Sequence, residues 1–207
     1  MTVTRGKIHE YLGMTLDFTD KGQVHIKMME YLYEVLVDLP REFDGEASTP
    51  AASHLFDVDE DSPLVSEDRA QFFHTYVAKT LFVCKRVRPD LQTAVSFLCT
   101  RVKHCTEEDW KKLKRMLQYM RATKDDYLTL SATSLYNVRW WVDASYAVHP
   151  GMKSHTGGCL SLGHGALYGT SRRQKLNTKS STESELCLLY TSPSPRDLST
   201  SRMPSSA

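Results

Sequence analysis

Alternation between apolar and polar residues dominates the first 28 positions of the chain. Before Asp20-Lys21-Gly22, one set of apolar residues falls on every second position, and after it a second set lies on one face in the same way. The two sets are Leu12, Met14, Leu16 and Phe18, and then Val24, Ile26 and Met28. This period of two predicts a β-hairpin over residues 7–28 with one buried side. A short amphipathic helix is expected over residues 31–39, and Pro40 ends it.

Apolar residues recur at helical spacing three times between residues 66 and 124. We expect a first helix over 66–84 with Ser66 as its cap, and a second that begins at Arg88-Pro89. A third begins at Thr106, where the acids that follow make a near capping box and oppose the helix dipole. The residues expected to be buried are Phe73, Tyr76, Val77, Thr80, Leu81, Leu91, Ala94, Val95, Leu98, Val102, Trp110, Leu113, Leu117 and Met120.

The region 132–189 reads as strand, strand, strand and helix. The strands are expected at 139–145, 156–162 and 165–170, and the helix after Ser180. Trp140 and Trp141 point to opposite faces of the first strand, so one of them is expected in the core. The last eighteen residues are rich in Ser, Thr and Pro without any period, which predicts disorder.

Length and composition indicate an ordinary globular protein. A chain of 207 residues with 41% apolar content can hold one sizeable core or two small ones. The sequence has no apolar leader and no apolar run of about 18 residues, so we expect neither secretion nor membrane spanning. The five cysteines are widely spaced without a Cys-x-x-Cys pair, which favours reduced thiols in an intracellular protein over disulfides or zinc.

The formal net charge of +1 hides two oppositely charged segments. Residues 38–69 carry ten acids against two arginines, a net charge of −8. Residues 85–124 carry eleven bases against four acids, a net charge of +7. The first segment repels phosphate and the second attracts it. Residues 41–65, which are acidic and proline-containing, are predicted to form a long surface loop.

Several short motifs occur in a fixed order along the chain. They are Tyr11-Leu12-Gly13-Met14, Ser48-Thr49-Pro50, Val87-Arg88-Pro89-Asp90, the run from Leu113 to Thr123, Val142-Asp143-Ala144-Ser145, Lys153-Ser154-His155-Thr156-Gly157-Gly158, Ser171-Arg172-Arg173-Gln174 and the run from Lys179 to Leu186. In this order they resemble the Pol polyprotein of copia-type LTR retrotransposons, and the resemblance covers nearly all of residues 7–189. Several ordered motifs together are more specific than any one of them.

The resemblance implies a mixed α+β fold with five regions. These are the end of a reverse transcriptase palm with a primer-grip-like hairpin and a helix (1–40), an acidic loop (41–65), a helical thumb-like subdomain (66–131), the N-terminal half of a ribonuclease H-like α/β unit (132–189) and a disordered tail (190–207). The tail also resembles a terminus that recurs on unrelated translated transcripts, so we expect it to be non-native.

Two carboxylates correspond to the ribonuclease H site of that family. Such a site holds two divalent ions, one preparing the attacking water and one stabilising the leaving oxygen, and Mg²⁺ suits hard carboxylate oxygens. By the resemblance, Asp143 on the first strand and Glu185 on the helix are the catalytic and metal-binding residues, with Glu183 as the alternative to Glu185. Without the resemblance, Asp143 reads as a turn former at a strand end, and the two glutamates as a solvated first helical turn.

The remaining acids of the two family sites are not found in this sequence. The acid that follows Glu185 is Asp197, which lies in the Ser/Pro tail and receives no role. The adjacent pair Asp125-Asp126 follows a predicted helix end and reads as a solvated loop rather than a polymerase site. We therefore expect weak Mg²⁺ binding and no cleavage of an RNA–DNA hybrid by this chain.

Basic residues of the third helix, together with Arg88 at the start of the second, are the predicted nucleic-acid contacts. Lys111, Lys112, Lys114, Arg115 and Arg88 are assigned to phosphate, with Lys85 and Arg86 nearby. The alternative is an ordinary solvated helix face. By the resemblance, Tyr11, Leu12, Gly13 and Met14 form a primer-grip-like segment, for which a half-buried strand is the alternative. His149, His155 and His164 have no ligand spacing and are interpreted as loop and strand residues.

Three hypotheses follow for the function. The first is a fragment of a retrotransposon reverse transcriptase and ribonuclease H polyprotein, inactive as it stands, whose partners are an RNA–DNA hybrid and the remainder of the polyprotein. The second is a non-catalytic nucleic-acid-binding module that uses the basic helical face. The third is a cellular protein that shares only a ribonuclease H-like core. The expected location is intracellular, in the cytoplasm or also the nucleus, without membrane contact.

Overall fold

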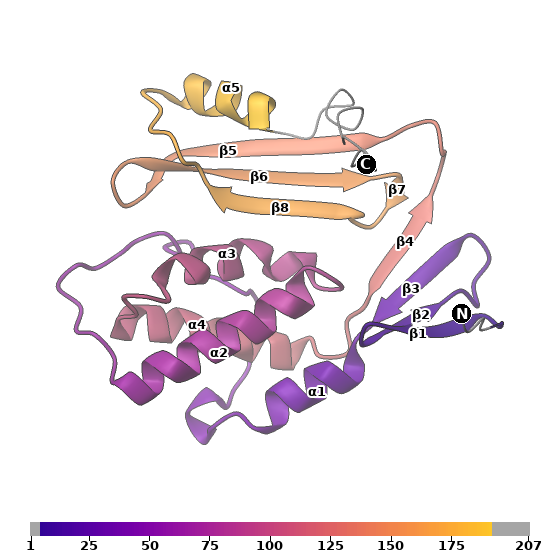
Figure 1. Cartoon of the computed structure of the whole chain (residues 1–207), viewed down its shortest axis with the longest axis horizontal. Coiled ribbons are helices and arrows are strands. Elements are labelled where there is room, and N and C mark those ends of the chain that lie inside the picture. Colours follow the sequence, from indigo (N-terminus) through magenta and orange to yellow (C-terminus); the bar gives the residue numbers. More distant parts are fainter. Residues whose placement is uncertain (1–4, 192–207) are drawn as a thin grey trace, which may run out of the picture.

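The computed structural model describes residues 5–191 and has a mixed α+β architecture with two antiparallel sheets (Figure 1). Its helices are α1 (Met29–Val37), α2 (Glu67–Cys84), α3 (Gln92–Arg101), α4 (Glu107–Ala122) and α5 (Ser181–Thr191), with 3-10 turns at Arg41–Phe43 and Pro89–Leu91. Its strands are β1 (Ile8–Tyr11), β2 (Met14–Asp17), β3 (Gln23–Lys27), β4 (Leu128–Ala132), β5 (Arg139–His149), β6 (Lys153–Ser161), β7 (Gly163–His164) and β8 (Tyr168–Arg173). Within the described range, no helix is long and apolar enough to cross a membrane.

The N-terminal segment is a three-stranded meander instead of the single hairpin that alternation predicts. Leu12 and Gly13 have φ values of 50° and 75°, so they form a tight turn that joins β1 to β2. Alternation places Leu12 on the buried face, but the residue is 61% exposed. A turn that requires two positive φ angles interrupts the strand locally, although the apolar alternation continues through it.

The first sheet also recruits segments from far along the sequence. Its order is β1-β2-β3-β4-β7, so β4 pairs with β3 across about a hundred residues and β7 pairs with β4. In Figure 1, β4 rises from this sheet toward the second one. The sheet therefore joins the regions 1–40, 66–131 and 132–189, which the sequence presents as separate units.

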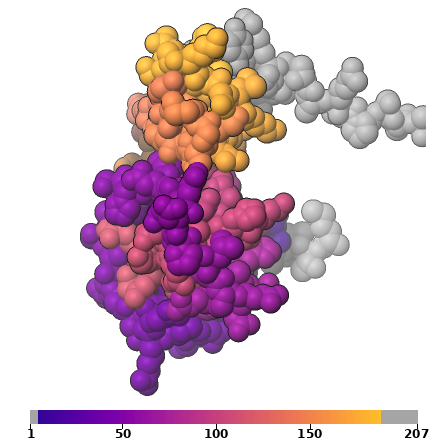
Figure 2. Space-filling model, turned by 90° about the vertical axis from the view of Figure 1, so that its left-hand side faces the viewer, coloured from indigo at the N-terminus to yellow at the C-terminus, as the bar shows by residue number. Residues whose placement is uncertain are grey.

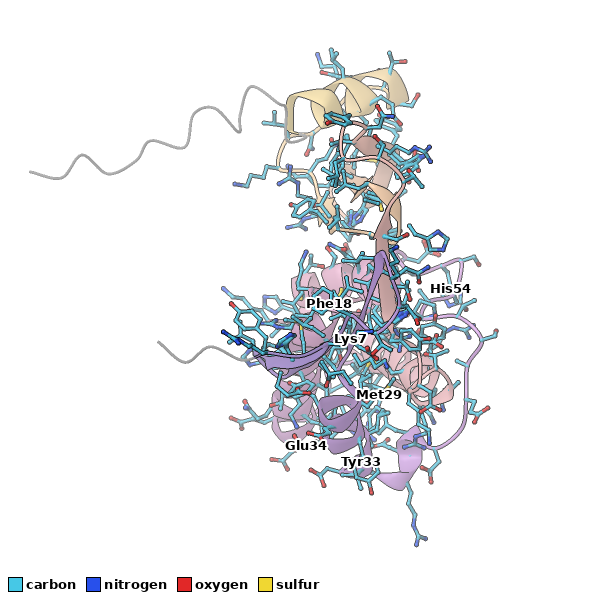
Figure 3. The ribbon with its side chains drawn as sticks, turned by 90° about the vertical axis from the view of Figure 1, so that its right-hand side faces the viewer. Lys7, Phe18, Met29, Tyr33, Glu34 and His54 are labelled. Atoms are coloured by element: carbon cyan, nitrogen blue, oxygen red, sulfur yellow. The ribbon has the colours of Figure 1, made fainter. Side chains whose placement is uncertain are left out.

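The helices α1 to α4 share one hydrophobic core, as the helical spacing predicts. In α1, Leu32, Val35 and Leu36 are buried, whereas Tyr33 and Glu34 lie on its outer side (Figure 3). Most of the predicted helical core residues are buried, with Leu81 and Val102 packed at its edge. The start of the second predicted helix is a 3-10 turn at Pro89–Leu91, and the α-helix follows it.

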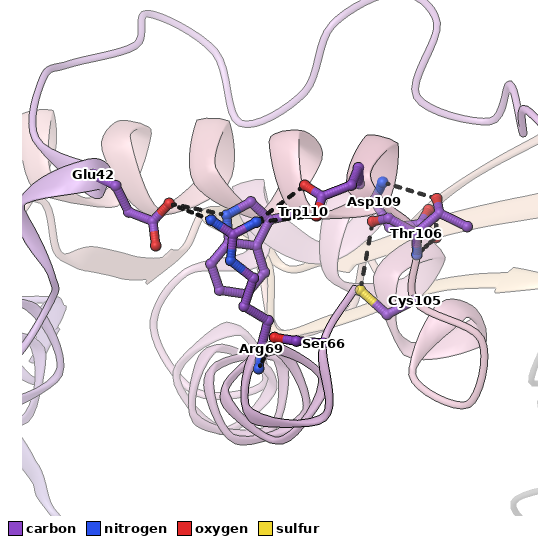
Figure 4. A network of polar contacts seen from close by, with 8 residues as sticks. Glu42, Ser66, Arg69, Cys105, Thr106, Asp109 and Trp110 are labelled. Carbon is purple, nitrogen blue, oxygen red and sulfur yellow. Dashed lines mark hydrogen bonds and ion pairs between the residues drawn. The ribbon is translucent and has the colours of Figure 1, made fainter. Parts of the chain in front are cut away.

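The predicted caps of α2 and α4 are confirmed. The Ser66 hydroxyl accepts a hydrogen bond from the Arg69 amide. At α4, the Thr106 hydroxyl accepts from the Asp109 amide, and the Asp109 carboxylate accepts from the Thr106 amide at 3.1 Å. Figure 4 shows both caps beside Arg69, whose guanidinium lies 4.9 Å from the Trp110 ring.

The acidic segment 41–65 is anchored to the helical core, contrary to the simple surface loop that its composition predicts. Phe43 is fully buried against Phe72 and Trp110, and Leu55 is 6% exposed. Arg121 forms an ion pair with Asp44 at 2.7 Å. Isolated apolar residues in a polar segment give no periodic signal, so their burial becomes visible only in the folded chain.

The second sheet has the order β5-β6-β8 and is the upper part of the molecule in Figure 1. Figure 2 shows it as a lobe stacked on the helical lobe, which matches the contact between α3 and β8. The three predicted strands are present, but the third lies at 168–173 because residues 163–164 pair with β4. The predicted disordered tail begins inside α5, whose backbone extends to Thr191, and residues 192–207 lie outside the described range.

A buried arginine joins the segment between α2 and α3 to the end of α4. Arg88 is 2% exposed. Its guanidinium donates to both carboxylate oxygens of Asp90, the shortest bond being 2.7 Å, and to the carbonyl and hydroxyl oxygens of Thr123. All three nitrogens are therefore satisfied inside the fold. This arrangement contradicts the expectation that Arg88 contacts phosphate.

We predict that Arg88→Ala destabilises the fold strongly. Removing the guanidinium leaves the Thr123 carbonyl without its charged donor, which costs about 1–3 kcal/mol, whereas the Asp90 side chain is 36% exposed and can be solvated. Urea denaturation followed by far-UV circular dichroism measures the change in the free energy of unfolding. Lys103→Ala, at an exposed position, is the control and should change it by less than about 0.5 kcal/mol. A decrease below about 1 kcal/mol for Arg88→Ala would contradict the role assigned to this arginine.

Candidate functional site

The predicted strand carboxylate lies in the middle of β5, on the face that α3 covers. Asp143 pairs with Gly157 on β6, which in turn pairs with Ser171 on β8, so these three residues share one face of the sheet. On the same face, the Ser96 hydroxyl of α3 donates to the Ser171 carbonyl at 2.6 Å. Asp143 is exposed, and its carboxylate has no hydrogen bond or ion pair with the residues that the structure describes. Its carboxylate is therefore free to accept from a ligand.

The two helix glutamates differ in what their carboxylates contact. Glu183 accepts a hydrogen bond from the Lys179 amide at 2.6 Å, and its own amide donates to the Ser180 hydroxyl, so it caps the start of α5. Glu185 instead accepts from the Ala144 amide of β5 at 3.2 Å. Ala144 directly follows Asp143 in β5, so Glu185 contacts the strand at the residue next to the predicted strand acid.

The number of carboxylates limits the metal chemistry that Asp143 and Glu185 can support. Asp143 on the sheet face and Glu185 at the edge of β5 carry hard carboxylate oxygens, the ligand type that Mg²⁺ takes together with water. In the described part of the chain, no group of three or more His, Cys, Asp or Glu side chains is placed to hold a metal ion. Two carboxylates hold one divalent ion weakly and cannot fix a metal pair.

The basic residues of α4 are partly engaged by the acidic segment that lies against them. Lys112 donates to the Asp57 carbonyl, and Arg115 donates to the Thr49 hydroxyl at 2.9 Å. Lys111 pairs with Glu108 on its own helix at 2.6 Å. Burial lowers the pKa of Lys112, so part of this face has become interior. Lys114 is half-buried, and the described residues offer its ammonium group no hydrogen-bond partner.

The segment predicted to resemble a primer grip forms the tip of the first hairpin. Tyr11 and Leu12 are 59% and 61% exposed, Gly13 completes the turn, and Met14 packs at the edge of the core. The alternative prediction was a half-buried strand, and the turn at Leu12 and Gly13 interrupts that strand. Lys7 and Phe18, both labelled in Figure 3, lie at the opposite, open end of the same hairpin, where the Phe18 amide donates to the Lys7 carbonyl at 2.7 Å.

A buried histidine pair was missed by the sequence reasoning. The Nε2 atom of His149 and the Nδ1 atom of His155 are 2.8 Å apart, and the His155 Nε2 atom lies 2.6 Å from the Ser171 hydroxyl. Both rings are nearly fully buried and contact Phe56. Burial lowers the pKa of each histidine to about 4, and for His149 the neighbouring ring adds to the effect. The Pro-Gly turn between them signals the chain reversal, but His149 pairs with Lys153 and His155 with Ser145, and the ladder shifts register between Ser145 and His149.

His155 of this pair lines a pocket between the helical lobe and the second sheet. The pocket has a volume of about 460 Å³ and is lined by Phe56, Gln92, Trp141, Asp143, Gly157 and Ser171, among others. Pockets between domains with a few converging polar groups are common ligand sites. Of the predicted site residues, the structure therefore places Asp143 in the pocket wall and Glu185 at the neighbouring strand edge.

Comparison with known proteins identifies relatives among retrotransposon proteins. The retrovirus-related Pol polyprotein from transposon TNT 1-94 of Nicotiana tabacum is 25% identical over 187 residues, which cover 87% of this chain and 14% of the relative. That from transposon RE1 of Arabidopsis thaliana is 26% identical over 190 residues, covering 86% and 12%. An uncharacterized mitochondrial protein of Arabidopsis thaliana is 34% identical over 99 residues, covering 47% and 41%.

These relatives confirm the resemblance to copia-type Pol polyproteins, at modest identity over most of the chain. The chain spans 41% of the length of the mitochondrial relative and 12–14% of the two Pol polyproteins. No family model matches the chain, and no solved structure matches it significantly.

We predict that the histidine pair makes stability fall as the pH drops below about 6.5. The folded-state pKa values of about 4 lie below the ordinary value of 6.5, so the unfolded state binds protons first. This contribution is complete above pH 6.5 and is lost as the pH falls toward 4, at about 1.4 kcal/mol per pH unit for each site. Urea denaturation at pH 7.5, 6.5, 5.5 and 5.0 measures it.

Two variants test the assignment. His155→Gln should flatten the pH dependence between 6.5 and 5.0, because it removes one titrating group and separates the other from its partner. His74→Gln, at an exposed position on α2, is the matched control and should leave the slope unchanged. An equal slope in wild type and His155→Gln would contradict the assignment.

Proposed function

We propose that this chain, whose relatives are Pol polyproteins of copia-type retrotransposons, is a part of such a polyprotein that contributes two carboxylates to a ribonuclease H-type site. The observation that carries the proposal is the hydrogen bond from the Ala144 amide to the Glu185 carboxylate at 3.2 Å. It brings the helix acid to the strand position next to Asp143. Such a site requires a strand acid and a helix acid close to each other, and the contact of Glu185 with the residue after Asp143 supports this proposal.

Glu185 is the helix ligand in this proposal and Glu183 is not. The Glu183 carboxylate already accepts the Lys179 amide, which stabilises the helix start. Withdrawing it to a metal would leave that amide without its partner. The contact of Glu185 with a backbone amide is made at an open strand edge, so its second oxygen remains available.

Mg²⁺ is the proposed cofactor, held by Asp143 and Glu185 together with water. When bound, a divalent ion of this kind of site prepares a water molecule for attack on a phosphodiester and stabilises the leaving oxygen. The chain itself supplies two ligands, so it holds the ion weakly and we propose that it does not cleave an RNA–DNA hybrid unaided. The proposed substrate of the complete site is the RNA strand of such a hybrid.

The helical lobe is proposed to act as the thumb-like part, with the exposed tip at Tyr11 and Leu12 as the primer-grip-like element. Support comes from the extent of the similarity, which covers 86–87% of the chain in two Pol polyproteins. The remainder of the polyprotein and a nucleic-acid duplex are the proposed partners. The proposed location is the cytoplasm or the nucleus, where such a duplex is processed.

The alternative function, binding of nucleic acid without catalysis through the α4 face, has less support. The acidic segment engages Lys112 and Arg115, and Arg88 is buried. Lys111 and Lys114 remain as the residues that can reach a phosphate. The basic surface of α4 that is open to a nucleic acid is therefore smaller than the number of basic residues in the sequence indicates.

We predict weak Mn²⁺ binding that depends on Asp143 and Glu185. Mn²⁺ substitutes for Mg²⁺ and is followed by electron paramagnetic resonance of the free ion. Asp143→Asn and Glu185→Gln should each weaken binding about tenfold or more, because each removes one of two carboxylate ligands. Glu183→Gln is the matched control and should retain it. Equal weakening in Glu183→Gln and Glu185→Gln would overturn the assignment of Glu185. Mg²⁺-dependent hybrid cleavage by this chain that Asp143→Asn abolishes would instead overturn the proposal that the chain does not cleave a hybrid unaided.

We predict that nucleic-acid binding depends on salt through Lys111 and Lys114. The double variant Lys111→Gln/Lys114→Gln should lower the slope of log affinity against log salt by about 0.9 for each phosphate that the chain no longer neutralises. Fluorescence anisotropy with a labelled RNA–DNA hybrid between 50 and 200 mM KCl measures the slope. Lys103→Gln/Lys124→Gln makes the same charge change elsewhere. The same decrease in both double variants would show that the α4 face has no particular role.

A further inference from the structure

The sequence from Ala144 to Thr182 is basic and contains no acid. Its charged residues are Lys153, Arg172, Arg173, Lys175 and Lys179, which give a net charge of +5. The basic segment 85–124 differs, because it contains four acids and the acidic segment 41–65 lies against its helix α4. The positive charge of residues 144–182 therefore has no acid of its own segment to oppose it.

Four of these residues lie around one end of the second sheet. Figure 1 shows the turn between β5 and β6 and the segment from β8 to α5 at this end. The Lys153 ammonium group donates to the Lys175 carbonyl, which joins the two segments. Arg173 is the last residue of β8, and Lys179 lies two residues before α5. Arg172 points to the other face of β8. We call the remaining four, Lys153, Arg173, Lys175 and Lys179, the sheet-end surface.

The charges of the sheet-end surface are open to a ligand. Arg173, Lys175 and Lys179 are exposed. Within residues 5–191, no ion pair involves any residue of this surface. The Glu183 carboxylate lies at the same end but accepts from the Lys179 backbone amide, so it does not contact an ammonium group. Several uncompensated cations on one surface attract a polyanion.

Buried hydroxyl groups hold this end of the sheet in place. The Ser154 hydroxyl lies 3.0 Å from that of Thr178 and 2.9 Å from that of Ser184, and the latter two are 2.5 Å apart. All three side chains are buried. The Gln174 amide also donates to the Ser154 carbonyl at 2.8 Å. The segment between β8 and α5 is thereby fixed to β6, so its backbone needs little ordering when its cations bind a ligand.

The sheet-end surface lies within reach of a duplex that contacts Asp143. Asp143, Gly157 and Ser171 are opposite one another on neighbouring strands, and Arg173 is two residues further along β8 on the same face. Two strand spacings of about 4.8 Å and two residue rises of about 3.3 Å place the Cα atoms of Asp143 and Arg173 roughly 12 Å apart. One strand of a duplex carries a phosphate about every 3.4 Å along the axis, so this separation corresponds to about three or four phosphates.

We propose that the sheet-end surface binds the phosphate backbone of a nucleic-acid duplex that extends from Asp143 toward the turn between β5 and β6. The inference deepens the proposed function, on which it rests for the identity of the duplex, an RNA–DNA hybrid. Phosphate contacts fix the position and register of a duplex without reading its sequence. The sheet-end surface thus positions the hybrid at the proposed metal site, a part that the sequence predicts for α4.

The test measures binding of a labelled RNA–DNA hybrid to the full chain by fluorescence anisotropy between 50 and 200 mM KCl, without divalent ions. The triple variant Arg173→Gln/Lys175→Gln/Lys179→Gln should weaken binding at 50 mM KCl by about tenfold or more. It should also lower the slope of log affinity against log salt by about 0.9 for each phosphate contact that is lost. Two hybrids of unrelated sequence should lose affinity by the same factor, because the contacts are to phosphate.

Two control variants separate the charge of this surface from total charge and from packing. Lys21→Gln/Lys103→Gln/Lys124→Gln makes the same charge change at exposed positions elsewhere and should bind the hybrid nearly as wild type does. Lys175→Arg/Lys179→Arg keeps both charges and should retain the wild-type slope. Unfolding midpoints establish that each variant is folded.

Three outcomes would overturn the sheet-end surface as a duplex contact. The first is wild-type affinity and slope in the folded triple variant. The second is an equal decrease in the triple variant with Lys21, Lys103 and Lys124 replaced. The third is binding to phosphatidylserine vesicles that falls in the first triple variant while hybrid binding is unchanged, which would assign the surface to a membrane.

These outcomes are separable from those for the proposed metal site. The variant at Arg173, Lys175 and Lys179 removes no carboxylate, so it should bind Mn²⁺ at least as tightly as wild type does. Asp143→Asn and Glu185→Gln should in turn retain the salt slope for the hybrid. An unchanged slope in the triple variant, with Mn²⁺ binding intact, would remove the sheet-end surface alone. Mn²⁺ binding that does not depend on Glu185, with the slope lowered as expected, would remove the metal site alone.

Discussion

The packing of α3 on one face of the β5–β6–β8 sheet is the contact on which the arrangement of this chain depends. Gln92 donates to the Gly169 carbonyl at 2.8 Å and Ser96 to the Ser171 carbonyl at 2.6 Å, so one helix is fixed along the outer strand. Beside them, the buried His149–His155 pair removes two rings from water, and burial keeps both rings neutral. The same contact turns the face that carries Asp143 toward the helical lobe and encloses the pocket there.

Much of the positive charge of this chain acts inside its own fold. Arg88 ties Asp90 to the end of α4, and Lys112 and Arg115 hold the acidic segment against the helix. Between residues 38–69 and 85–124, Asp44 and Arg121 form an ion pair at 2.7 Å, whereas Lys112 and Arg115 bind neutral oxygen acceptors of the acidic segment. The basic residues of α4 therefore leave less surface open to a nucleic acid than the sequence predicts, because Lys112 and Arg115 already bind groups that lie 55 and 66 residues away in the chain.

Local helix chemistry and tertiary contact divide the roles of the two glutamates. Glu183 lies within the first turn of α5, where a carboxylate can reach backbone amides and is favoured by the dipole. Glu185 is two residues further on, which turns its side chain to a different direction around the helix and toward Ala144 of β5. The proposed metal site follows from this placement, because it brings Glu185 to the strand position next to Asp143.

The sequence alone determined the helices α1 to α4 with most of their core, the order of strands and helix after residue 132, and the kinship with Pol polyproteins. These features rest on periods, caps and ordered motifs, which are local. Only the tertiary structure decided that β4 and β7 join the first sheet, that Arg88 is internal, that His149 meets His155 and that Glu185 reaches β5. Each of these depends on contacts between residues brought together by chain reversal or distant pairing, and periodicity along a sequence carries no record of which partner a side chain meets.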